Sequence, residues 1–307
     1  MADPILSITF LIMNISQNSK AFLIISVGII SISTASILIR WAEDVPSLII
    51  ATYRLSIAAL ILTGISLKQK SILYDLSNKK ELFLTLIAGI ALSMHFVLWI
   101  ESLRLTSVAS SVVLVYTSPI WTAVISHFFL KEEISSNLLF GVLISVVGVA
   151  LIAYSGAAVG ISASKGNLLA LLGGLMAGIY LSLGKILRRN KSTIVYSGSV
   201  YLTAAVILFI ISIISGRALT GYSFDMYILL LMIGIIPQLI GHTSFNWALK
   251  HRSAVSVSVL MLGEPVGASL LAAIFLREIP SGGELLGGGI LLTGIYFSLK
   301  QIRGDNV

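Results

Sequence analysis

A single carboxylate stands in the middle of an apolar stretch that is long enough to cross a membrane. The stretch runs from Ser253 to Glu278, and Glu264 lies near its midpoint, directly before Pro265. A charge at the centre of a bilayer costs about 2.5–3.5 kcal/mol, so it is expected to face a cavity, pair with another group or take up a proton. Pro265 removes a backbone donor and frees a carbonyl group nearby. Glu264 is therefore a candidate binding residue, and the alternative is a neutral carboxyl bonded to a neighbouring helix.

Polar and aromatic residues recur at helical spacing in two other stretches. Gln238, His242 and Asn246 are four residues apart, so they share one face of an otherwise apolar helix. His95 and Trp99 have the same spacing. Such groups on facing helices suit an amphipathic organic ligand, and a histidine with a glutamate can relay protons. The alternatives are interhelical hydrogen bonds made by the histidines and a position at the membrane surface for Trp99.

Two more candidates are Tyr116 and Arg54. Tyr116 either lines the same cavity or packs in the protein core. Arg54 is the one basic residue well inside an apolar run. It either binds an anionic group of a ligand or pairs with Glu43 or Asp44, and the sequence slightly favours the structural pairing.

The composition places all these residues in an integral membrane protein. The chain has 307 residues, of which 57% are hydrophobic and 11% charged, whereas soluble proteins carry about 25% charged residues. The absence of cysteine excludes disulfides, thiol catalysis and cysteine-bound metal. The net charge of +7 comes from basic residues in short loops, which indicates membrane topology and not nucleic-acid binding. We expect no cofactor and no metal ion.

The apolar runs predict ten transmembrane helices. Each run is about 20 residues long, which spans a bilayer at 1.5 Å per residue. The first 20 residues lack the features of a signal peptide and form a loose or interfacial segment. The predicted spans are approximately 21–39, 46–67, 82–103, 107–130, 137–156, 166–187, 195–216, 226–249, 254–276 and 284–301.

Lysine and arginine are distributed unevenly between the two sides of these spans. If the N-terminus is cytoplasmic, fourteen of them fall on the cytoplasmic side and five on the other. The positive-inside rule then predicts that both ends of the chain lie in the cytoplasm. The cytoplasmic (inner) cell membrane is the expected location.

The two halves of the chain are copies of each other. A shift of 146 residues places Pro119 on Pro265 and Glu132 on Glu278, and it gives 13 identities in 42 positions from Ser107 onward. Ser118 falls on Glu264, so the copies differ at the candidate site, as a carrier of an asymmetric substrate requires. The matching glycine pairs, which lie seven residues apart, predict a close packing seam between the halves or between two protomers of a homodimer. These glycines are Gly141 and Gly148, matched by Gly287 and Gly294.

An odd number of spans in each copy inverts the second copy in the membrane. The predicted fold is all-α, with two inverted five-helix repeats that share a site near the middle of the bilayer. The boundaries are an N-terminal segment at 1–20, the first repeat at 21–156, a linker at 157–163, the second repeat at 164–301 and a tail at 302–307.

Four sequence segments carry a resemblance to a known family. They are TSPIWTAVISHFFLKE (117–132), GEPVGASLLAAIFLRE (263–278), PSLIIATYRLSIAALIL from Pro46 and KGNLLALLGGLMAGIYL from Lys165. The first two segments are two copies of one motif in a ten-helix frame, and with the other two as supporting pieces they resemble the EamA-type half of the drug/metabolite transporter superfamily. The resemblance implies a secondary transporter, usually an exporter, of small metabolites, with a cavity between two five-helix bundles.

We therefore expect a secondary exporter of small organic metabolites or amino acids that works by alternating access. Glu264, His95, Trp99, Tyr116, Gln238, His242, Asn246, Ser118 and Arg54 are the predicted substrate-binding residues. A proton is a candidate coupling ion. The alternatives are a channel and an intramembrane enzyme acting on lipid, although the chain has no HExxH, GxSxG or phosphate-loop motif.

Overall fold

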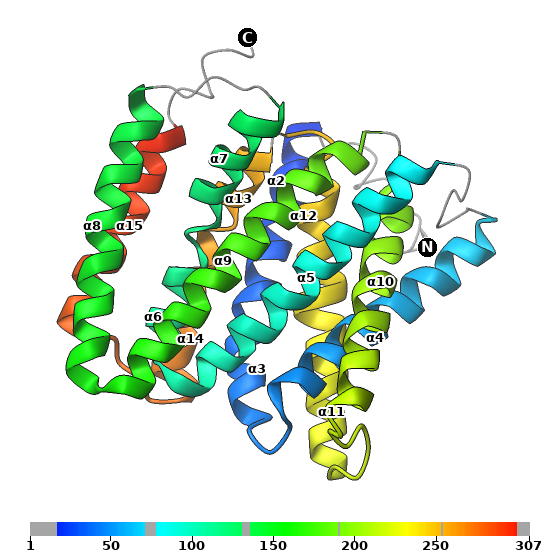
Figure 1. Ribbon diagram of the computed structural model, residues 1–307, viewed down its shortest axis with the longest axis horizontal. Helices are drawn as coiled ribbons and strands as arrows, with labels where there is room; N and C mark the ends of the chain where they lie inside the picture. The colour runs from blue at the N-terminus through cyan, green and yellow to red at the C-terminus, as the bar shows by residue number, and fades with distance from the viewer. Residues whose placement is uncertain (1–16, 71–77, 131–135, 190, 253, 300–307) are drawn as a thin grey trace, which may run out of the picture.

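The described part of the chain is built from helices and turns, with no strand (Figure 1). The computed structural model describes residues 17–70, 78–130, 136–189, 191–252 and 254–299, so residues 1–16 and the expected tail at 302–307 lie outside it. The helices of the first half are α2 (Gln17–Ser33), α3 (Ala35–Trp41), α4 (Ser47–Lys68), α5 (Lys79–Leu105), α6 (Val108–Val115), α7 (Ser118–Leu130) and α8 (Ser136–Val159). Those of the second half are α9 (Ile161–Leu187), α10 (Thr193–Ile214), α11 (Phe224–Ile233), the π-helix η1 (Gly234–His242), α12 (Thr243–Ala248), α13 (Ala254–Leu260), α14 (Gly263–Phe275) and α15 (Gly282–Leu299).

Seven helices or helix pairs in the described residues are long and apolar enough to cross a membrane. They coincide with seven of the expected spans and run over Ala21–Trp41, Ser47–Lys68, Lys79–Leu105, Val108–Phe128, Ile161–Leu187, Thr193–Ile214 and Phe224–Ala248. Shorter apolar helices at Leu143–Ile152 and Gly263–Phe275 lie within two more, and α15 overlaps the last. The protein is thus a multi-pass helical membrane protein, whereas the number of ten crossings stays a prediction. Residues 157–163, the expected linker, hold the end of α8, Gly160 and the start of α9.

Side-chain caps set the start of several helices. The side-chain oxygens of five residues accept a hydrogen bond from the backbone N–H three residues later, which satisfies a donor that the first turn leaves free. These residues are Asn78 before α5, Ser107 before α6, Ser192 before α10, Ser223 before α11 and Ser281 before α15. The capped ends lie at the short turns, where the chain reverses direction.

The two stretches that match at a shift of 146 residues are both broken helices. One breaks at Tyr116 and Thr117, between α6 and α7, and the other at Met261 and Leu262, between α13 and α14. Each proline lies in the first turn of the second piece, where a missing N–H costs nothing. The sequence indicated a helix that is only loosened near Pro265, and the structure shows a larger change. The helix ends and restarts, and Glu264 lies in the first turn of α14.

A π-helix interrupts the helix that carries the predicted polar face. The nine residues of η1 include Pro237, which cannot donate a backbone hydrogen bond. A π-helical turn changes the direction of the side chains that follow, and such turns are frequent at functional sites. Here the turn carries both Gln238 and His242.

Helices from the two halves of the sequence pack against each other. α5 packs along α9, α4 along α10, and α8 along α15, and the last pair lies at one edge of the molecule (Figure 1). A Cβ atom on Gly148 would lie 2.5 Å from the backbone nitrogen of Leu291, and one on Gly294 would lie 2.6 Å from the carbonyl oxygen of Gly141. The predicted glycine seam between the halves is therefore confirmed.

Candidate functional site

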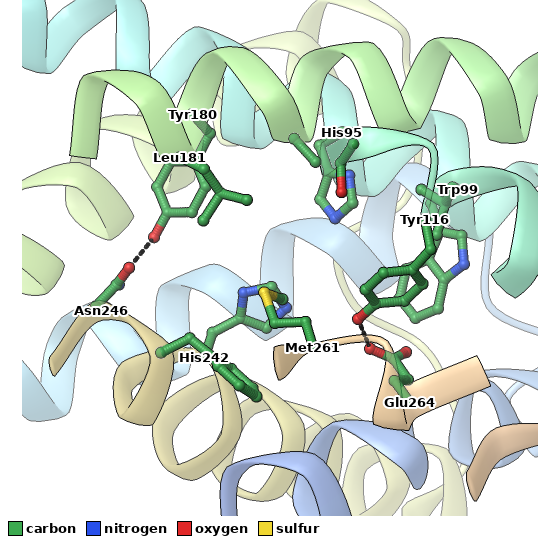
Figure 2. A pocket seen from close by; sticks show the side chains of 13 residues that line it. His95, Trp99, Tyr116, Tyr180, Leu181, His242, Asn246, Met261 and Glu264 are labelled. Carbon is green, nitrogen blue, oxygen red and sulfur yellow. Dashed lines mark hydrogen bonds between the residues drawn. The ribbon is translucent and has the colours of Figure 1, made fainter. Parts of the chain in front are cut away.

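A buried pocket lies where helices of both halves meet (Figure 2). The space between its walls is about 550 Å³, with its opening included. α5, the α6–α7 break, α9, the η1–α12 segment and the α13–α14 break each contribute side chains. The lining residues are His95, Trp99, Val115, Tyr116, Ser118, Ala177, Tyr180, Leu181, His242, Phe245, Asn246, Met261 and Glu264.

Glu264 and Tyr116 meet at one end of the pocket. The Tyr116 hydroxyl donates a hydrogen bond to Oε2 of Glu264 (Figure 2), and both residues are about 95% buried. Each residue lies beside the break in its own helix, so the two breaks bring the phenol and the carboxylate together. Glu264 is thus both bonded to a residue of a neighbouring helix and part of the pocket wall. The sequence had offered these two positions as alternatives.

Aromatic rings form a second wall. The His95 ring stacks on Trp99 with an interplanar angle of 7°, and its Nδ1 lies 3.0 Å from the carbonyl oxygen of Gly173. His242 contacts the edge of Phe96, with 5.2 Å between ring centroids. Trp99 is 3% exposed, so the expected alternative position at the membrane surface is wrong. These rings suit an apolar or aromatic portion of a ligand.

Asn246 is held at the opposite end of the pocket by a buried hydrogen-bond network. Its Oδ1 accepts a hydrogen bond of 2.7 Å from the Tyr180 hydroxyl (Figure 2). Its Nδ2 donates to the Ser197 and Tyr201 hydroxyl oxygens, at 3.0 and 3.1 Å. The Asn246 carbonyl oxygen accepts from Nε of Arg188. All four side-chain and backbone bonds are made within the protein, so this end of the pocket is rigid.

Arg54 and Gln238 lie behind the aromatic wall and bind each other. Nε of Arg54 donates a 2.7 Å hydrogen bond to Oε1 of Gln238, and both residues are 0% exposed. The guanidinium carbon lies 4.1 Å from the centroid of the Phe96 ring and 5.6 Å from that of Trp99. Both Nη atoms of Arg54 lack a hydrogen-bond partner. The expected pairing with Glu43 or Asp44 is therefore wrong.

The structure brings most of the predicted site residues into one place. Arg54 and Gln238 do not line the pocket but adjoin its aromatic wall. Whether any of the predicted residues binds a substrate stays a prediction. The seven that do line the pocket are His95, Trp99, Tyr116, Ser118, His242, Asn246 and Glu264.

The sequence reasoning missed the contribution of α9. Tyr180 and Leu181 line the pocket, and the signal for them is a set of glycines on the same helix. A Cβ atom on Gly174 would lie 2.6 Å from the carbonyl oxygen of Val115. The glycines thus mark the face of α9 that lies against the α6–α7 break. From these glycines the sequence could have predicted that this face of α9 carries pocket residues.

A separate polar cluster joins three connections at one end of the helices. Arg40 pairs with Glu278 at 2.9 Å and donates to the carbonyl oxygen of Thr106, also at 2.9 Å. The carboxylate of Glu284 accepts from the Ser107 and Ser110 hydroxyls. This cluster joins the ends of α3, α5–α6 and α14–α15.

Apolar helices surrounding a buried pocket with polar groups define a class of membrane protein that handles a small molecule. Among the residues that the structure describes, no three His, Asp or Glu side chains gather as a metal site requires. The model of the EamA-like transporter family matches the chain twice, over residues 19–154 and 164–300. The chain belongs to the EamA-like transporter family, and its partners are therefore a small-molecule substrate and the lipid bilayer.

Other proteins resemble the chain over most of its length. An uncharacterized transporter of Clostridium kluyveri is 26% identical over 73% of this chain and 74% of its own length. One of Archaeoglobus fulgidus is 26% identical over 82% and 88%. A probable terminal-alkyne amino-acid exporter of Streptantibioticus cattleyicolor is 24% identical over 62% and 64%. A crystal structure with 20% identity superposes with a TM-score of 0.68 over 94% of this chain and 99% of the other, which shows the shared fold.

Proposed function

We propose that the protein is a secondary exporter of small organic metabolites or amino acids that works by alternating access in the cytoplasmic membrane. The observation that carries this proposal is the pocket itself. Its lining residues come from both segments that match the family model. A site shared between two halves can open to one side of the membrane and then to the other as the halves move.

The ten-span inverted repeat is part of this proposal. The helix breaks at Tyr116 and Met261 lie close to the same position of each copy, which supports a duplicated unit. The first repeat takes residues 21–156 and the second 164–301, with both ends of the chain in the cytoplasm. Discontinuous helices at the interface of two such repeats are a common way to build a transport site.

The pocket residues take different roles in the proposed site. The aromatic wall of His95, Trp99 and His242 holds the apolar part of the substrate, and Asn246 and Ser118 supply neutral polar contacts. Glu264 binds a positively charged group or carries a coupling proton. The amino-acid exporter among the similar proteins supports an amino acid as one class of substrate.

Transport assays with Glu264 variants test the proposal. The purified protein is reconstituted in liposomes, and the uptake of radiolabelled amino acids and small metabolites is measured with and without a pH gradient. We expect saturable uptake that Glu264→Gln and Glu264→Ala abolish while both variants remain folded. Uptake that never saturates indicates a channel, and undiminished uptake in both variants removes Glu264 from the mechanism.

Cysteine labelling tests the topology independently of the substrate. The chain contains no cysteine, so single cysteines introduced near each end report only on those positions. Both are expected to react from the cytoplasmic side with a reagent that cannot cross the membrane. Labelling of the two ends from different sides would contradict the inverted repeat.

A further inference from the structure

The described residues contain a buried arginine whose two terminal nitrogens have no partner. Arg54 is 0% exposed, and only its Nε makes a hydrogen bond, to Gln238. Nη1 and Nη2 of Arg54 have none. An ion pair at Arg40 and another at Lys191 use Glu278 and Glu81, and neither reaches Arg54. The carboxylate of Glu264 interacts electrostatically with Arg54, but among the described residues no hydrogen bond or ion pair joins the two side chains. Buried donors without a partner are costly, so the two Nη atoms require an additional acceptor.

Arg188 shows how this fold treats an arginine with a structural role. Arg188 is also buried, at 1% exposed. Its Nε donates to the carbonyl oxygen of Asn246, its Nη1 to that of Lys191, and its Nη2 to the hydroxyl of Thr193. Every nitrogen is satisfied by the protein. Arg54 differs in that two of its three nitrogens are left free, next to the pocket wall.

The unsatisfied groups around Arg54 are all donors. Besides the two Nη atoms, Nε2 of Gln238 and Nε1 of Trp99 lack a hydrogen-bond partner. Gln238 is bonded to Arg54, and the Trp99 ring lies 5.6 Å from the guanidinium carbon. Trp99 also lines the pocket. A group that satisfies the free donors of Arg54 and Gln238 must offer acceptor atoms, and an ionised carboxylate meets that requirement.

We propose that Arg54, Gln238 and Trp99 form a subsite for a carboxylate of the substrate. The planar guanidinium can hold both oxygens of a carboxylate in parallel hydrogen bonds. The carboxylate passes the edge of Trp99 and Phe96, so these rings shift when the substrate enters. The subsite rests on the proposed transport function and specifies the chemistry of the transported molecule.

Matched carboxylates and carboxamides test the subsite by binding. The pairs are leucine and leucinamide, 4-methylpentanoate and 4-methylpentanamide, and succinate and succinamide, and the readout is the unfolding temperature of the protein in lipid nanodiscs. We expect at least one carboxylate to stabilise the wild type more strongly than its amide. Equal stabilisation by the amides, or none by any carboxylate, would overturn the assignment.

Two variants change the subsite in opposite ways. Arg54→Gln removes the charge, and it is expected to weaken binding of the carboxylate by about 30-fold or more without affecting the amide. Gln238→Glu places a carboxylate of the protein beside Arg54, so it is expected to raise the unfolding temperature and abolish carboxylate binding. Arg217→Gln, on the exposed α10–α11 connection, is the control with the same change of charge. Carboxylate binding that survives in Gln238→Glu would contradict the proposal.

Flux measurements separate this proposal from the one on which it rests. Binding that depends on the carboxylate, without flux of the same compound in liposomes, supports the subsite and refutes transport. Saturable flux that is unchanged in both Arg54→Gln and Gln238→Glu supports transport and refutes the subsite.

Discussion

The hydrogen bond between Tyr116 and Glu264 lies at one end of the pocket, and removal of the Tyr116 hydroxyl tests whether this bond joins the two helix breaks. Tyr116→Phe deletes the donor to the Glu264 carboxylate and changes little of the side-chain volume. Hydrogen bonds between membrane helices couple by about 0.6 kcal/mol on average and by about 1.7 kcal/mol at most. Bonds to charged groups lie at the strong end of the range. Because both residues are about 95% buried, we expect a coupling of about 1–2 kcal/mol.

A double-mutant cycle measures this coupling directly. The free energies of unfolding of the wild type, Tyr116→Phe, Glu264→Ala and the double variant are measured in mixed micelles. The matched control combines Tyr180→Phe with Glu264→Ala, since the Tyr180 hydroxyl is bonded to Asn246 at the other end of the pocket. The control pair is expected to be additive within about 0.5 kcal/mol. If Tyr116 and Glu264 are equally additive, the bond does not join the two helices and the reasoning fails.

Three other perturbations have defined outcomes. Gly287→Leu places a side chain 2.8 Å from the carbonyl oxygen of Gly148. It is expected to cost about 1–3 kcal/mol in thermal unfolding, whereas Gly289→Leu points into open space and is neutral; equal effects would contradict the seam. Arg40→Gln is expected to lower the free energy of unfolding by about 0–1 kcal/mol, and by less in 1 M salt, because the side chains of Arg40 and Glu278 are 27% and 31% exposed. A large loss of stability that does not depend on salt would contradict this expectation. Pro237→Ala restores a backbone donor in η1. It is expected to stabilise the protein by up to about 3 kcal/mol and to lower the flux of substrate. Unchanged flux would show that the π-helix has no role in transport.

Hydrophobic patterning made the helices and the duplication predictable. The described part of each long apolar run is helical close to the expected bounds, although several runs are divided into two or three helices, because residues in lipid must satisfy their backbone groups within a helix. The glycine seam between α8 and α15 was predictable from two glycine pairs at one offset, since close contact leaves no room for side chains. His95, His242 and Glu264 were recognisable as candidate pocket residues because they are polar residues within otherwise apolar helices.

What the sequence did not reveal depends on local backbone breaks and on contacts over long distances in the chain. Pro265 indicated a loosened helix, and the structure shows a complete restart that is repeated at Tyr116. The π-helix in η1 changes the direction of Gln238, so the even spacing of the polar face does not place Gln238 in the pocket. The partner of Arg54 lies 184 residues away, whereas the candidates close in the sequence were Glu43 and Asp44.

The direct backbone contact between α8 and α15 restricts how the two halves of the protein can move. Carbonyl oxygens and glycines touch along this pair, and such contacts lose much of their attraction when the surfaces separate by less than an ångström. Any movement between the halves is therefore expected to leave these two helices in contact.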